Sequence, residues 1–150
     1  MNSIAKGLLA GAVGTAALTV SSTIEQKLRR REPSTAPADA AAKVLGIKEF
    51  RDDQAKGAFG TAVHWTYGTT WGAVRGLLRS LGVSPVAASV VHFAAVWGSE
   101  QVMLPALGVS PPVTEWGAEE GAIDAFHHVV YVSATGAAYE ALNSRALPFA

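Results

Sequence analysis

The sequence predicts an all-α protein: a four-helix transmembrane bundle with a long polar first loop that contains a short interfacial helix. Four apolar segments, at about residues 4–24, 57–81, 85–107 and 121–142, each approach the ~20 residues that a bilayer-spanning helix needs. Charged residues are only 16% of the chain, below the usual quarter. No segment shows a competing strand pattern. We therefore expect one membrane-embedded helical domain over residues 1–150.

The composition excludes several classes of function. Twelve basic and twelve acidic residues balance, so there is no global basic field that would support nucleic-acid binding. The absence of cysteine removes disulfides, thiolate metal sites and cysteine nucleophiles. The mean hydropathy, +0.23, is low for a membrane protein and favours the alternative of a soluble bundle, which would be recovered without detergent.

The first segment, residues 4–24, contains Lys6 as its only charged residue. Gly7 and Gly11 form a G-x-x-x-G pair, a spacing that lets helices approach closely in lipid. A cleaved secretory signal is the competing interpretation, because a basic start precedes an apolar centre. The basic residues at 27–31 oppose it, because they would resist translocation.

The polar stretch from residue 25 to 56 is the predicted first loop. Within it, Pro37 and Asp39 precede a run of alanines that ends at Gly46, a pattern typical of a short helix over residues 38–45. Its polar side would allow this helix to lie on a membrane surface.

The second segment contains three glycines at four-residue spacing, Gly68, Gly72 and Gly76. In a soluble helix they would cost about 3 kcal/mol relative to alanine, whereas in lipid they form a packing groove. Arg75 and Arg79 follow, and we expect their side chains to extend towards the membrane surface.

The third segment begins with Ser84 as N-cap and Pro85 at the first helical position. Pro105 is expected to kink or end it. Two further prolines, at 111 and 112, keep the connection to the fourth segment extended.

Ionisable residues at membrane depth are costly, so they are candidates for a functional site that faces the bundle interior. Three of the four segments carry histidine, and Asp124 lies three residues before His127, a spacing that lets two side chains reach one ion on a helix. The candidate metal ligands are Glu25, His64, His92, Glu100, Asp124, His127 and His128.

Several roles remain open for these residues. Histidines and carboxylates on facing helices suit a Zn, Fe or Mn ion. Imidazoles are also suited to relaying protons. Haem held by two histidines is less favoured, and the chain has no haem-attachment motif. In the plainest interpretation these side chains hydrogen-bond one another and fix the packing. No enzyme class follows from the sequence.

Two runs carry a resemblance to a known family: Leu-Gly-Val-Ser-Pro-Pro-Val at 107–113 and Asp-Ala-Phe-His-His-Val-Val-Tyr at 124–131. Here the chain resembles the YagU-like family of bacterial inner-membrane proteins, whose function is unknown. The resemblance implies a multi-pass protein of the bacterial inner membrane and makes His128 the counterpart of the family's histidine. Glu25, His64 and His92 correspond more loosely, and the first loop departs from the family in length and charge.

Four spans would place the first and third connections on one side of the membrane. Most of the Lys and Arg residues lie in the first loop, so the positive-inside rule predicts a cytoplasmic loop and external termini. The resemblance implies cytoplasmic termini instead. The expected partners are the lipid bilayer and a second copy or a larger membrane complex. Glycine faces that pointed outward would favour a structural or accessory subunit, with a purely structural polar cluster.

Overall fold

A computed structural model describes residues 1–144, which contain five α-helices, one 3-10 turn and no strand, so the all-α prediction is confirmed. The helices are α1 (Ser3–Arg29), α2 (Ala36–Val44), α3 (Asp53–Ser80), α4 (Pro85–Ala106) and α5 (Ala118–Ser144), and the turn is η1 (Val113–Glu115). The short α2 lies in the first loop where it was predicted.

Three of the four long helices extend beyond the apolar segments because polar residues cap and continue them. The side chain of Asn2 accepts the backbone N–H of Ala5 at 2.8 Å, which begins α1. That helix ends where Arg30 adopts a left-handed backbone with φ 54°. Asp52 accepts the N–H of Ala55 at 2.7 Å and so begins α3 within the stretch expected to be a connection.

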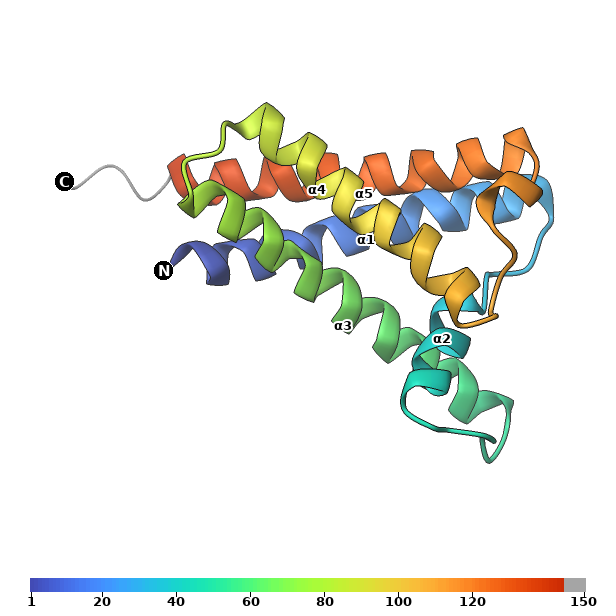
Figure 1. Ribbon diagram of the computed structural model, residues 1–150. Coiled ribbons are helices and arrows are strands. Elements are labelled where there is room, and N and C mark those ends of the chain that lie inside the picture. Colours follow the sequence, from blue (N-terminus) through green and yellow to red (C-terminus); the bar gives the residue numbers. More distant parts are fainter. Residues whose placement is uncertain (145–150) are drawn as a thin grey trace.

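The long helix α1 lies between α3 and α5 and makes most of the contacts between helices. In Figure 1, α1 and α5 run side by side, whereas α3 diverges from them towards α2, and α4 passes in front. Both described chain ends lie beside the α3–α4 link, at what we name the terminus end. The opposite end, with α2, η1 and the two longer connections, is named the loop end.

The predicted glycine rows meet each other inside the chain, between α1 and α3. A Cβ on Gly72 would overlap the carbonyl oxygen of Gly7 and lie 2.6 Å from the Cα of Gly11. A Cβ on Gly76 would lie 3.1 Å from the Cα of Ile4. Close backbone approach of this kind requires glycine on both helices. These glycine faces therefore do not point outward.

The interior is unusually polar, and the exterior is apolar. The largest fully buried side chains are those of Arg75, Tyr139, His92, Thr15 and Thr135. Large apolar side chains are exposed on every long helix. Examples are Leu9, Val13, Trp65, Val86, Val90, Phe126 and Val129.

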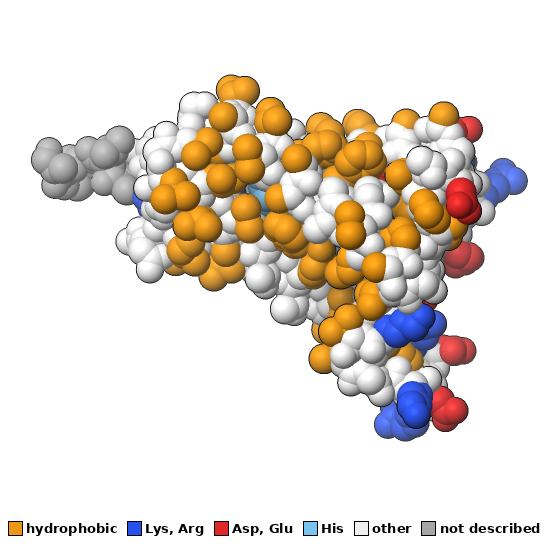
Figure 2. All heavy atoms as spheres, in the orientation of Figure 1, with side chains coloured by type: hydrophobic (Ala, Val, Ile, Leu, Met, Phe, Trp, Pro, Cys, Tyr) orange, Lys and Arg blue, Asp and Glu red, His pale blue; other side chains and the backbone are white. Residues whose placement is uncertain are grey.

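Charged side chains are restricted to the two ends of the molecule. Residues 7–24, 57–74, 85–99 and 125–139 contain no Lys, Arg, Asp or Glu, and the shortest of these runs covers 15 residues, or about 22 Å of helix. Figure 2 shows most of the blue and red side chains gathered at the loop end, with orange apolar side chains over the body. By length and hydropathy, α1 alone among the described helices qualifies as a membrane span.

The glycine contact gives a direct test of the packing. Gly72→Ala is expected to lower the free energy of unfolding by about 1–3 kcal/mol, because its methyl group would meet backbone atoms of α1 that cannot move aside. Gly98→Ala is the control, because no atom lies within 4 Å of a Cβ added there. Thermal unfolding in detergent, followed by circular dichroism, measures the difference. Equal unfolding temperatures for the two variants would contradict this packing.

Candidate metal centre

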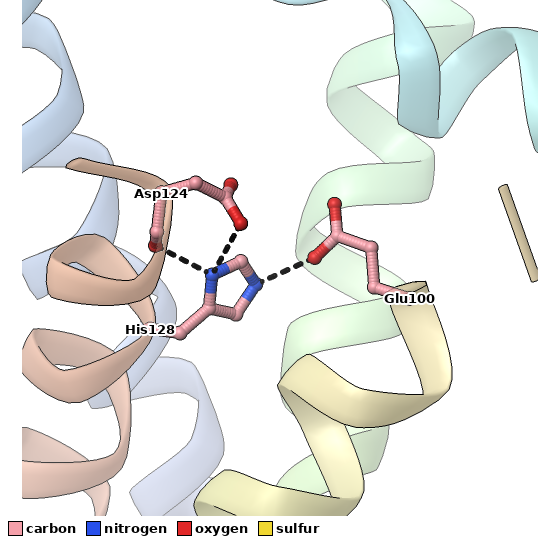
Figure 3. Close-up of side chains that lie close together, drawn as sticks. All are labelled: Glu100, Asp124 and His128. Atoms are coloured by element: carbon pink, nitrogen blue, oxygen red, sulfur yellow. Dashed lines mark hydrogen bonds and ion pairs between the residues drawn. The ribbon is translucent and has the colours of Figure 1, made fainter. Parts of the chain in front are cut away.

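Three of the predicted ligands come together between α4 and α5 near the loop end. Glu100 comes from α4, whereas Asp124 and His128 lie one turn apart on α5. The Nε2 atom of His128 is 2.9 Å from Oε2 of Glu100, and its Nδ1 atom is 3.8 Å from Oδ2 of Asp124. One ligand atom from each residue lies within 4.8 Å of the other two, close enough to hold one metal ion (Figure 3).

Backbone contact orients the imidazole ring. The Nδ1 atom of His128 is 2.9 Å from the backbone oxygen of Asp124, and a carbonyl oxygen can only accept. Nδ1 must therefore carry the hydrogen of this bond, which leaves Nε2 facing Glu100 either to donate or to bind a metal through its lone pair. A histidine whose second nitrogen donates to a carbonyl is the usual arrangement of a metal ligand.

The aspartate is also held in place by a neighbouring helix. The indole Nε1 of Trp97, one turn before Glu100 on α4, donates to Oδ2 of Asp124 at 2.8 Å. This bond fixes the carboxylate that faces the ring. The site is only partly enclosed: the side chains of Glu100, Asp124 and His128 are 19%, 27% and 14% exposed. The arrangement supplies one nitrogen and two carboxylate ligands, with positions left for water.

Two other predicted residues form a separate contact on the opposite side of α5. The Nδ1 atom of His127 is hydrogen-bonded to the hydroxyl of Ser21 at 2.7 Å. The Nε2 atom of the same ring is 3.7 Å from Oε2 of Glu25. Arg31 donates to both carboxylate oxygens of Glu25, and these bonds raise the pKa of Arg31. His128, rather than its neighbour His127, is thus the histidine that shares a site with Asp124.

The two remaining histidines each join a different pair of helices. His64 on α3 lies 2.9 Å from the hydroxyl of Thr19 on α1. His92 on α4 is fully buried, and its Nε2 donates to the backbone oxygen of Trp71 at 3.0 Å. The structure therefore distributes the seven predicted residues over four places rather than one cluster.

The expectation that Arg75 and Arg79 extend to the membrane surface is corrected by their contacts. The guanidinium of Arg75 is 1% exposed and donates to Ser89 at 2.8 Å and to Glu140 at 3.1 Å. Arg79 donates to the same Glu140 carboxylate at 2.8 Å. Arg75 also donates to the backbone oxygen of Pro85, the first residue of α4, and Arg79 donates to the backbone oxygen of Val83 in the α3–α4 link. The sequence did not indicate that Glu140 pairs with these two arginines.

Removing this carboxylate should destabilise the fold. Glu140→Ala is expected to lower the free energy of unfolding by about 2–3 kcal/mol, because Arg75 would remain buried without its counter-charge. Glu119→Ala is the control, since the Glu119 side chain is 77% exposed and its ion pair is solvated. Chemical unfolding in detergent gives both values, and a loss for Glu140→Ala no larger than the control's would show that the buried pair is not stabilising.

Comparison of the chain with protein-family models, with curated proteins and with solved structures found no match in any of the three. The resemblance to the YagU-like family therefore stays an expectation from the sequence, and the functional argument depends on the geometry of the chain itself.

Proposed function

We propose that this protein is a multi-pass protein of the bacterial inner membrane whose Glu100, Asp124 and His128 bind a divalent metal ion. The observation that carries the proposal is the convergence of an imidazole and two carboxylates from two helices within 4.8 Å. The choice of a bacterial inner membrane follows the resemblance of residues 107–113 and 124–131 to the YagU-like family.

The distribution of polarity supports the membrane environment. Arginine, histidine and threonine side chains are buried, whereas leucine, valine and phenylalanine side chains are exposed. This distribution is the reverse of the one usual in water-soluble proteins. The uncharged run in each long helix is followed by a charged side chain that has a charged or histidine partner, namely Glu25, Arg75, Glu100 or Glu140, so the four runs form one uncharged belt around the molecule. The belt holds even though only α1 passes a hydropathy test, because glycine, histidine and tryptophan lower the hydropathy of α3 and α4.

Cysteine labelling tests the four spans without background, because the native chain has no cysteine. Lys48→Cys in the first loop and Thr114→Cys in the third connection should react with an impermeant maleimide from the same side of the membrane. Leu81→Cys in the α3–α4 link should react only from the other side. All three positions are exposed and lie outside the long helices, and Leu81 directly follows the last residue of α3. Labelling of all three from one side would exclude this topology.

The metal proposal has a direct test in elemental analysis of detergent-purified protein loaded with Zn, Fe or Mn. Wild type should retain close to one ion per chain. His128→Gln should lose it, because the ring supplies the one nitrogen ligand. His64→Gln is the matched control, because His64 bonds Thr19 on a different pair of helices.

Each outcome separates the proposal from its rivals. Equal loss in both variants would point to unfolding rather than ligation. Absence of metal from folded wild type would leave a proton relay, for which an imidazole placed between the carboxylates of Glu100 and Asp124 is also suited. A structural or accessory subunit is less favoured, since the glycine faces that it would offer to a partner already pack together. Haem is not proposed, because the histidines on facing helices have separate partners.

A further inference from the structure

The side chain of Gln101, the residue after Glu100 on α4, has no hydrogen-bond partner within the described chain. Both polar atoms of the Gln101 amide, Oε1 and Nε2, are buried, and neither forms a hydrogen bond there. Burying an amide without hydrogen-bond partners costs about 1–3 kcal/mol of folding free energy, so we expect a bound species to supply a partner for this side chain. Gln101 directly follows Glu100 and is the unexplained polar group next to that site.

The spacing of α4 places this amide at the edge of the face that meets α5. Trp97 and Glu100 define that face, because Trp97 bonds Asp124 and Glu100 contacts His128. Gln101 lies one turn after Trp97, so its side chain projects from the same side of the helix. A glutamine side chain is long and flexible enough to turn its oxygen towards an ion held by its neighbour.

We propose that Gln101 is a fourth protein ligand of this centre, through Oε1, and that it makes the centre suited to octahedral cations of the Mn²⁺ class. The inference rests on the proposed function of Glu100, Asp124 and His128. The complete set is then three oxygens and one nitrogen, and no sulfur ligand exists in the chain other than methionine. Oxygen-rich sets of this kind suit Mn²⁺ and Mg²⁺.

The fourth ligand matters differently for two metals. Zn²⁺ is satisfied by three protein ligands and one water in a tetrahedral site. An octahedral ion needs six ligands, so the loss of one protein oxygen leaves it with one more water to hold. The ratio of the Mn²⁺ and Zn²⁺ dissociation constants therefore reports on Gln101, and a general loss of folding would change both constants together.

The experiment titrates detergent-purified full-length protein with Mn²⁺, followed by electron paramagnetic resonance, and with Zn²⁺ in competition with a chromophoric chelator. Gln101→Met, which keeps the length of the side chain but removes its oxygen, should weaken Mn²⁺ binding about tenfold and Zn²⁺ binding much less. Gln101→Glu, which keeps an oxygen at the same distance, should preserve Mn²⁺ binding. Gln54→Met is the control at an exposed position.

The two proposals fail in different ways. If wild type binds neither ion, the metal centre itself is refuted. If wild type binds metal and Gln101→Met weakens Mn²⁺ and Zn²⁺ equally or not at all, the centre stands and Gln101 is not a ligand. Loss of Mn²⁺ binding in Gln101→Glu would likewise overturn the assignment, because the substituted side chain still offers an oxygen.

Discussion

The close approach of α1 to α3 is the constraint on which the rest of the fold depends. Glycines on both helices bring backbone against backbone, with a Cβ on Gly72 unable to fit beside Gly7 and Gly11. Because α1 also packs along α5, this contact sets where α5 lies relative to α3. The α4 helix then has space between them, where His92 bonds Trp71 and Glu100 reaches His128. The candidate metal centre is thus positioned by residues that carry no functional group.

Much of this architecture could be predicted from the sequence, because it depends on local patterns. Apolar runs and caps such as Ser84 located the helices, and the glycine spacing identified the packing faces. The helix ends were predicted less well, since charged residues such as Asp52 extend a helix beyond its apolar part. Hydropathy does not select α3 as a membrane span, although its glycines pack inside the chain against α1.

The candidate site could be predicted only as a set of residue types. Seven residues shared the property of being ionisable within apolar segments, but which of them meet depends on how each helix is rotated about its axis. His127 and His128 differ by one position, or about 100° around α5, and this difference alone sends them to opposite neighbours. The roles of Trp97 and Glu140 were not predicted, because the sequence spacing does not show which side chain of another helix each one meets.

The two adjacent histidines have a mechanical consequence. His127 bonds Ser21 of α1 and lies 3.7 Å from Glu25, and His128 contacts Glu100 of α4, so consecutive residues connect α5 to two helices. A turn of α5 about its own axis cannot change one attachment and leave the other unchanged. A rotation of α5 that changed the contact with Glu100 would therefore also change the contacts of His127 with Ser21 and Glu25, near the end of α1 where the charged first loop begins.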